Sequence, residues 1–142
     1  MRAIALPVAL IAAFLLSNCG NGLPHSNQVT ATVTPAQATV AIGATVALDG
    51  NATGFTQTPI VRWWVQEARD AGGDDCGYLK LPAASPCPFG YVIYADKFPS
   101  SATYYAPATT GTYHVTFEVT QFSYGAFDHL TKTATATITT TP

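Results

Sequence analysis

The chain has 142 residues, of which 48% are hydrophobic and 10% are charged, and its formal net charge at pH 7 is −2. Because the basic residues form no patch, a nucleic-acid partner is not expected. The length predicts one domain that is large enough to bury a core of its own.

The N-terminal segment has the layout of a bacterial lipoprotein signal. Arg2 precedes an unbroken apolar stretch of 14 residues, Ala3 to Leu16, and Ser17 and Asn18 then lead directly to Cys19. A membrane-spanning helix needs about 20 apolar residues, whereas the hydrophobic region of a signal peptide needs about 7–15. We therefore predict that residues 1–18 are a signal peptide and that acyl chains such as palmitate on Cys19 hold the exported protein on a bacterial membrane. The alternative is an ordinary secretory signal and a soluble secreted domain, with Cys19 incidental.

The number of cysteines agrees with a lipid on Cys19. The chain has three cysteines, an odd number for an exported protein. Cys76 and Cys87 are close in sequence and are expected to form a disulfide, which leaves Cys19 for the lipid. In the chain-entropy model, closing so short a loop contributes roughly 3 kcal/mol. The alternative is zinc, but two cysteines without a histidine at ligand spacing do not favour it, and neither a metal nor a cofactor is expected.

After a short polar tether, residues 19–27, the sequence alternates with the period of half-buried strands. In residues 45–52 the side chains of Val46, Leu48, Gly50 and Ala52 share one face. The Asp49-Gly50 pair is also typical of a tight turn, but the alternation continues through it and favours a strand. Strands are expected at 29–33, 39–42, 45–52, 60–66, 91–95, 103–105, 112–121 and 132–140.

The apolar positions of these strands predict which side chains face the core. Val61, Trp63 and Val65 alternate with Arg62, Trp64 and Gln66, and 112–121 is the strongest strand, with one apolar face, Tyr113, Val115, Phe117 and Val119. Its opposite face carries His114, Thr116, Glu118 and Thr120. No segment after Cys19 has convincing helical periodicity. The pattern predicts an all-β fold over residues 28–141, a two-sheet Greek-key sandwich of about seven strands.

Six segments in this order resemble bacterial Ig-like domains of the group 2 type: Val33-Thr34-Pro35, Val40-Ala41-Ile42-Gly43, Val61-Arg62-Trp63, Tyr104-Tyr105-Ala106-Pro107, Gly111-Thr112-Tyr113-His114-Val115 and Thr133-Ala134-Thr135-Ala136-Thr137-Ile138. The resemblance covers about residues 28–141. It implies an Ig-like sandwich on a cell surface that serves adhesion, spacing or binding, with no shared catalytic residue. Tyr113 resembles the tyrosine-corner position, where the hydroxyl bonds to nearby backbone.

An insertion, residues 67–90, departs from that pattern and contains Cys76 and Cys87. Loops of this length are often functional or tied down, and the disulfide would tie this one down. Its acidic residues, Asp70, Asp74 and Asp75, are of the type that calcium prefers, but their spacing is not that of an EF-hand, so a solvated turn is favoured. Three further side chains either pack the insertion on the sheet or form a binding knob: Tyr78, Leu79 and Leu81.

Two groups of aromatic residues are candidate binding surfaces for an unknown surface protein or glycan. Phe122, Tyr124 and Phe127 lie in the turn 121–130, where they either contact a partner or, as the favoured alternative, cover the open end of the core. Trp64 and Tyr105 are expected to point outward, where they either stack on a sugar or a neighbouring domain or pack beneath the insertion. The turn and the Gly54-Phe55 loop are expected at one end of the sandwich, with the cysteine-containing insertion at the other.

Catalytic residues are not evident in the sequence. The three histidines, His25, His114 and His129, are far apart in the sequence. His114 and His129 are able to approach each other across the final hairpin, but two histidines on a sheet surface are more often incidental than metal ligands. Glu67 and Glu118 have no evident partner for acid–base chemistry, and no nucleophile elbow, zinc-protease helix motif or phosphate loop occurs. We therefore expect no enzyme, and predict a lipid-anchored surface module for adhesion or binding. The alternative is a purely structural spacer or envelope component.

Overall fold

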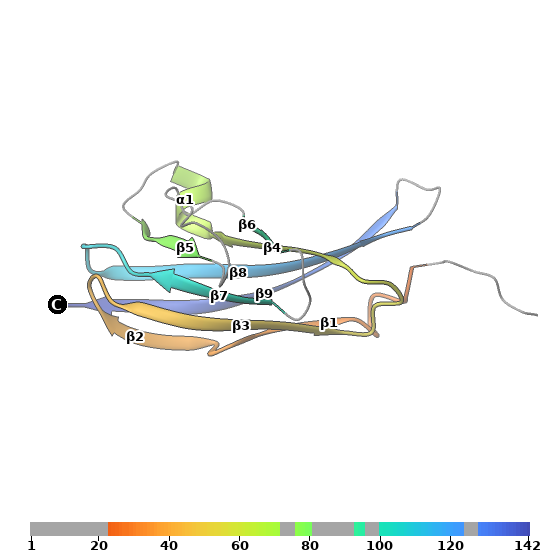
Figure 1. The fold of residues 1–142 in the computed structure, drawn as a ribbon, viewed down its shortest axis with the longest axis horizontal. Helices are drawn as coiled ribbons and strands as arrows, with labels where there is room; N and C mark the ends of the chain where they lie inside the picture. Colours follow the sequence, from red (N-terminus) through yellow and green to blue (C-terminus); the bar gives the residue numbers. More distant parts are fainter. Residues whose placement is uncertain (1–22, 72–75, 81–92, 96–99, 124–127) are drawn as a thin grey trace, which may run out of the picture.

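The computed structural model describes residues 23–71, 76–80, 93–95, 100–123 and 128–142. Two β-sheets pack face to face (Figure 1). The first sheet has the strand order β1-β3-β7-β5, with bounds Thr30–Thr34, Thr45–Thr53, Ser100–Tyr105 and Tyr78–Lys80. The second has the order β2-β9-β8-β4-β6, with bounds Gln37–Ala41, His129–Thr141, Gly111–Phe122, Ile60–Val65 and Ile93–Ala95.

This strand order is that of an immunoglobulin sandwich. Strands β1, β3, β7 and β5 take the places of Ig strands A, B, E and D, and β9, β8, β4 and β6 take those of G, F, C and C′. The chain changes sheets between β1 and β2, so that β1 pairs antiparallel with β3 while β2 pairs parallel with β9. The predicted all-β, Ig-like two-sheet sandwich is therefore confirmed, with nine strands in the described residues where about seven were expected.

The alternating apolar residues of both sheets form one core. In β3, each second residue from Val46 to Ala52 is buried, which confirms the strand through Asp49-Gly50 and excludes the turn. Trp63 of β4 and Phe117 of β8 are fully buried, with ring centroids 4.8 Å apart. The Trp63 indole donates a hydrogen bond of 2.9 Å to Ser100 Oγ in the facing sheet, so the largest core side chain is also bonded across the sandwich.

The tyrosine corner that the resemblance implies is present. The Tyr113 hydroxyl lies 2.8 Å from Thr109 Oγ1 and donates to the Thr109 carbonyl at 3.4 Å. Thr140 Oγ1 of β9 donates to the same carbonyl at 2.9 Å. These bonds hold the turn before β8 against the last strand.

Two elements between β4 and residue 81 were not predicted. Helix α1, Gln66–Ala71, follows β4 directly; six residues are too few to show a helical period. Strand β5 pairs with β7, and its Leu79 is fully buried, so Leu79 packs this segment into the core and is not part of an exposed knob. Leu81 lies outside the described residues. Among the described helices, none is both long and apolar enough to cross a membrane.

Candidate functional site

The N-terminal segment enters the sandwich beside the loop that follows β3. Gln28 N donates to the His25 carbonyl at 2.9 Å in a turn, and Thr30 then pairs with Thr53 at the end of β3. Gly54 has a φ of 85°, and a Cβ there would lie 2.8 Å from the Gln28 carbonyl carbon. Gln28, the residue that follows the tether, is therefore in direct backbone contact with Gly54, and a side chain at Gly54 would separate them.

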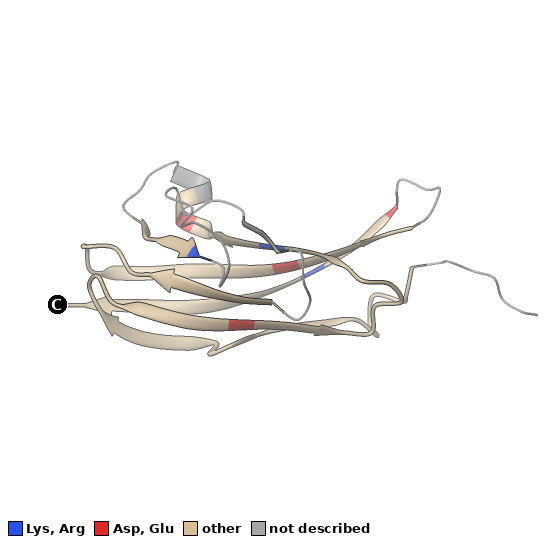
Figure 2. Ribbon diagram, in the orientation of Figure 1, with Lys and Arg blue, Asp and Glu red and all other residues tan. Residues whose placement is uncertain are grey.

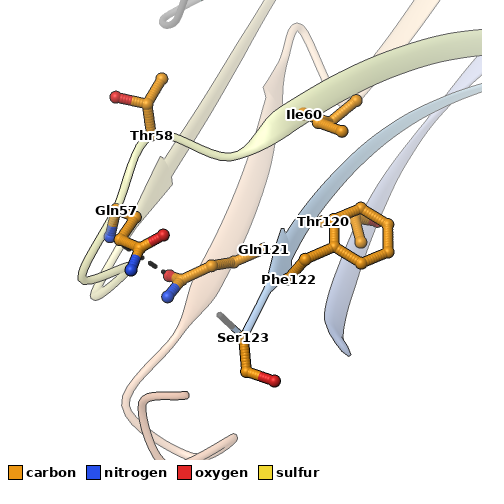
Figure 3. Close-up of a pocket in the computed structure, with 7 residues that line it drawn as sticks. All are labelled: Gln57, Thr58, Ile60, Thr120, Gln121, Phe122 and Ser123. Atoms are coloured by element: carbon orange, nitrogen blue, oxygen red, sulfur yellow. Dashed lines mark hydrogen bonds between the residues drawn. The ribbon is translucent and has the colours of Figure 1, made fainter. Parts of the chain in front are cut away.

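The Gln121 side chain joins this loop to the end of β8. Its Oε1 accepts hydrogen bonds from Thr56 N at 3.0 Å and Gln57 N at 3.3 Å, and its Nε2 donates to Thr56 Oγ1 at 2.7 Å. Gln121 is 2% exposed, and a buried amide requires such partners. Figure 3 shows the side chain pointing toward the backbone of Gln57. The prediction that the turn after β8 and the Gly54-Phe55 loop share one end of the sandwich is confirmed.

An open hollow of about 310 Å³ lies at this end, on the outer face of the five-stranded sheet. Ile60 is 47% exposed and Phe122 is 51% exposed, both large values for apolar side chains. Ile60 pairs with Thr120, and Phe122 is two residues further along β8, so all three face the same way (Figure 3). The remaining lining residues are uncharged: Gln57, Thr58, Gln121 and Ser123.

Phe122 is the described member of the predicted aromatic turn. Its ring lies 5.8 Å from the ring of His129, its partner in β9. Tyr124 and Phe127 lie outside the described residues, so an aromatic binding turn stays a prediction.

The opposite end of the sandwich carries α1, β5 and the start of β8 (Figure 1). Glu67 of α1 accepts a hydrogen bond from His114 N at 2.9 Å through one carboxylate oxygen, and its other oxygen lies 2.6 Å from His114 Nδ1. The sequence analysis missed this partner because α1 was not predicted. His114 pairs with Thr137 and His129 with Phe122, so the prediction that the two histidines approach each other is wrong: they lie at opposite ends of the long hairpin.

Glu118 also has a partner that the sequence did not reveal. It is buried on the outer face of the five-stranded sheet and forms an ion pair with Arg62, the residue opposite it in β4. Both glutamates therefore join elements of the fold. Few of the described residues are charged, and they are scattered along the chain (Figure 2). No group of three or more His, Cys, Asp or Glu side chains in the described part of the chain is placed to hold a metal ion; Asp74 and Asp75 lie outside it.

Trp64 and Tyr105 both point away from the core, as expected, but they do not form an exposed pair. Trp64 is 5% exposed, and its indole donates to Gln66 Oε1 at 3.3 Å, with the Arg62 guanidinium 6.0 Å from the ring centroid. It belongs to β4, whereas Tyr105 belongs to β7 in the other sheet. The expected exposure of Trp64 was wrong because period-two alternation places a side chain on a face but does not show what covers that face.

Tyr105 instead stacks on Tyr78. The two residues are paired in register across β5 and β7, and their rings lie 4.4 Å apart at an angle of 7°. Both side chains are half-buried, so part of each ring faces solvent on the outer face of the four-stranded sheet. Only the pairing of β5 with β7 brings these tyrosines together, and the sequence alone did not indicate it.

Beneath this pair, Tyr104 is fully buried and donates a hydrogen bond of 2.7 Å to the Cys76 carbonyl. Burial raises the pKa of the Tyr104 phenol far above its usual range, and the neighbouring Tyr113 adds to the effect. Cys76 is half-buried. Cys87 lies outside the described residues, so the Cys76–Cys87 disulfide stays a prediction.

The raised pKa of Tyr104 predicts a loss of stability in alkali. The folded state holds the phenolic proton more tightly than the unfolded chain, whose tyrosine pKa is about 10, so this contribution is intact below about pH 10 and falls as the pH rises above it. In Tyr104→Phe we expect the free energy of unfolding to decline less steeply above pH 10. At pH 8 the variant should lose about 1 kcal/mol with the bond to Cys76.

Urea unfolding followed by circular dichroism at pH 8, 10 and 11 measures this difference. Tyr105→Phe is the matched control, because it removes a half-buried phenol from the adjacent position. Parallel pH profiles for the wild type and Tyr104→Phe would show that Tyr104 does not determine the alkaline decline.

No protein-family model matches the sequence, and no curated protein matches it. One similar solved chain comes from a structure titled as the structural basis of T cell specificity and activation by the bacterial superantigen toxic shock syndrome toxin-1. It has 11% identity and a TM-score of 0.41, and the match covers 80% of this chain and 99% of that one. Another is domain 1 of VCBP3 from Branchiostoma floridae, with 14% identity, a TM-score of 0.42, and 84% and 97% of the two chains covered.

Proposed function

We propose that the protein is exported, anchored to a bacterial membrane by lipid on Cys19, and presents its Ig-like domain as a non-catalytic module that binds a surface protein or glycan. The Cys19 motif and the resemblance to group 2 Ig-like domains support this proposal. A non-catalytic role is supported by Glu67 and Glu118, whose carboxylates join elements of the fold.

The observation that carries the proposal is the place where the chain enters the sandwich. Eight residues lie between Cys19 and Gln28, and the nine Cα-to-Cα steps from one to the other reach about 30 Å at most. The turn from His25 to Gln28 shortens this reach. A lipid on Cys19 would therefore keep the 54–59 end near the membrane and leave the α1–β5 end facing outward.

We accordingly place partner capture at the outward end, around the Tyr78–Tyr105 stack. Tyrosine rings supply a large amphipathic contact area at low conformational cost, and these two rings are held rigidly by strand pairing and by each other. This site differs from the predicted aromatic turn, because Phe122 lies at the tethered end.

The intact mass of the membrane-extracted mature protein tests the anchor. A mass that shows residues 19–142 with a diacylated or triacylated Cys19 supports the proposal. A rise of about two mass units on reduction would also demonstrate a Cys76–Cys87 disulfide, because breaking one S–S bond adds two hydrogens. An unlipidated mass would contradict the anchor and favour a secreted soluble domain.

Site-specific photo-crosslinking on intact cells tests the binding role. A benzophenone side chain at Tyr105 should cross-link to a protein partner, whereas the same group at Ile60, exposed at the tethered end, is the matched control. A panel of immobilised glycans tests the other partner class, with Tyr78→Ser as the variant expected to lose binding. Neither cross-link nor glycan binding would favour the alternative of a structural spacer.

A further inference from the structure

We propose that the end of the sandwich that carries Ile60 and Phe122 rests on the lipid surface to which Cys19 is anchored, with these two side chains in the interfacial layer. This inference rests on the proposed function, because it takes Cys19 as the anchor. It adds a second contact with the bilayer and a defined orientation of the domain on it.

The apolar character of this end is the first argument. Three large hydrophobic side chains are exposed among the described residues, Ile42, Ile60 and Phe122. The last two lie on neighbouring strands of one sheet face and border the same hollow. Diagonal neighbours on a sheet are about 7–8 Å apart, within reach of large side chains, so Ile60 and Phe122 form one apolar surface.

The path of the tether is the second argument. A series of contacts connects the end of the tether to this surface: Gln28, which follows the tether, lies against Gly54, the same loop continues to Thr56, and Thr56 is bonded to Gln121, the residue before Phe122. The surface is thus tied to the segment that leads to Cys19. Because the chain between Cys19 and Gln28 reaches about 30 Å at most, a lipid on Cys19 would keep Ile60 and Phe122 at a high effective concentration beside the bilayer.

The charges determine what kind of contact this is. After removal of residues 1–18 the chain has five basic and eight acidic residues, so attraction to anionic headgroups does not drive the docking. The lining of the hollow is uncharged, with threonine, glutamine and serine around the two apolar side chains. Such a surface favours the headgroup–acyl boundary, where apolar groups are buried and polar groups stay hydrated.

Tryptophan placed at the two ends tests the orientation. The lipidated mature protein is prepared as Phe122→Trp, and as Ile42→Trp for a matched control at the opposite end; Trp63 and Trp64 are buried and common to both. Each variant is reconstituted in phosphatidylethanolamine–phosphatidylglycerol vesicles with plain or brominated acyl chains. We expect a blue-shifted emission for Phe122→Trp and quenching by brominated lipid about twofold stronger than for Ile42→Trp.

Equal quenching of the two variants, or none for Phe122→Trp, would overturn the inference and leave the lipid anchor in place. A blue shift that depends on protein density but not on bromine would point to a second copy of the chain and would also overturn it. Ile60→Trp repeats the test if Phe122→Trp does not fold. The mass of the same preparation reports the anchor independently, so an unlipidated Cys19 would be recognised as the failure of the proposed function itself.

Discussion

Replacing Gly50 is expected to destabilise the domain strongly, although alanine is a small residue. A Cβ at this position would lie 2.5 Å from Phe117 Cε2 and 2.7 Å from Trp63 Cζ2, closer than real Cβ contacts allow. Both rings are fully buried and in contact with each other, so neither has space to move. Overpacking of this kind costs about 1–3 kcal/mol for Gly50→Ala, and more for Gly50→Val.

Urea unfolding of Gly50→Ala and Gly50→Val measures this cost. Ala47→Val is the matched control, because it enlarges an exposed residue on the outer face of the same strand. In the Gly50→Ala background, Phe117→Leu should restore part of the lost stability, because the smaller leucine leaves room for the added Cβ. The effects of the two substitutions on the free energy of unfolding should therefore not be additive. Independent effects at the two positions, or an alanine variant as stable as the wild type, would show that the rings yield more easily than the packing implies.

Replacing Trp63 by alanine is expected to cost about 3–5 kcal/mol, as for other large-to-small changes of a buried tryptophan. Trp63 is fully buried between the sheets, and its indole bond to Ser100 links β4 to β7. Its removal leaves a cavity beside Phe117 and takes away the donor that reaches Ser100. A domain of this size has a total stability of about 5–15 kcal/mol, so the loss should be visible as a large fall in the urea midpoint.

The neighbouring tryptophan provides the control for this prediction. Trp64 is also buried, but it lies on the outer face of the sheet, where Arg62 and Gln66 surround it. Trp64→Ala removes the same number of atoms from outside the core between the sheets and leaves the bond between Trp63 and Ser100 in place, so its cost should be clearly smaller. A cost equal to that of Trp63→Ala would mean that the outer face of β4 is as tightly packed as the core.

Period-two alternation was sufficient for most of the strands. The run from Tyr113 to Val119 predicted β8, and the alternation through Asp49-Gly50 predicted β3 against a competing turn signal. These predictions succeeded because, in a strand with one buried face, the apolar residues must recur at every second position. The Ig-like arrangement followed from the order of the segments, and the Tyr113 corner followed from the resemblance.

The same alternation failed wherever burial depends on neighbours. Thr116, Glu118 and Thr120 lie on the outer face of β8, yet all three are buried, because β4 and β9 flank them. Sequence periodicity tells which face a residue takes, but the solvent exposure of that face is set by strands distant in the chain.

The sequence by itself determined the fold class and the core positions of the longest strands, because these depend on local patterns of apolar residues. The roles of Cys19, Cys76 and Cys87 are predicted from the signal-like segment and from the number of cysteines. The tertiary structure alone decided which side chains meet. It paired Glu67 with His114 and stacked Tyr78 on Tyr105 through β5, a strand of three residues. It also brought Gln28, Gly54 and Gln121 to one end, because contacts between distant segments arise only when both sheets have formed.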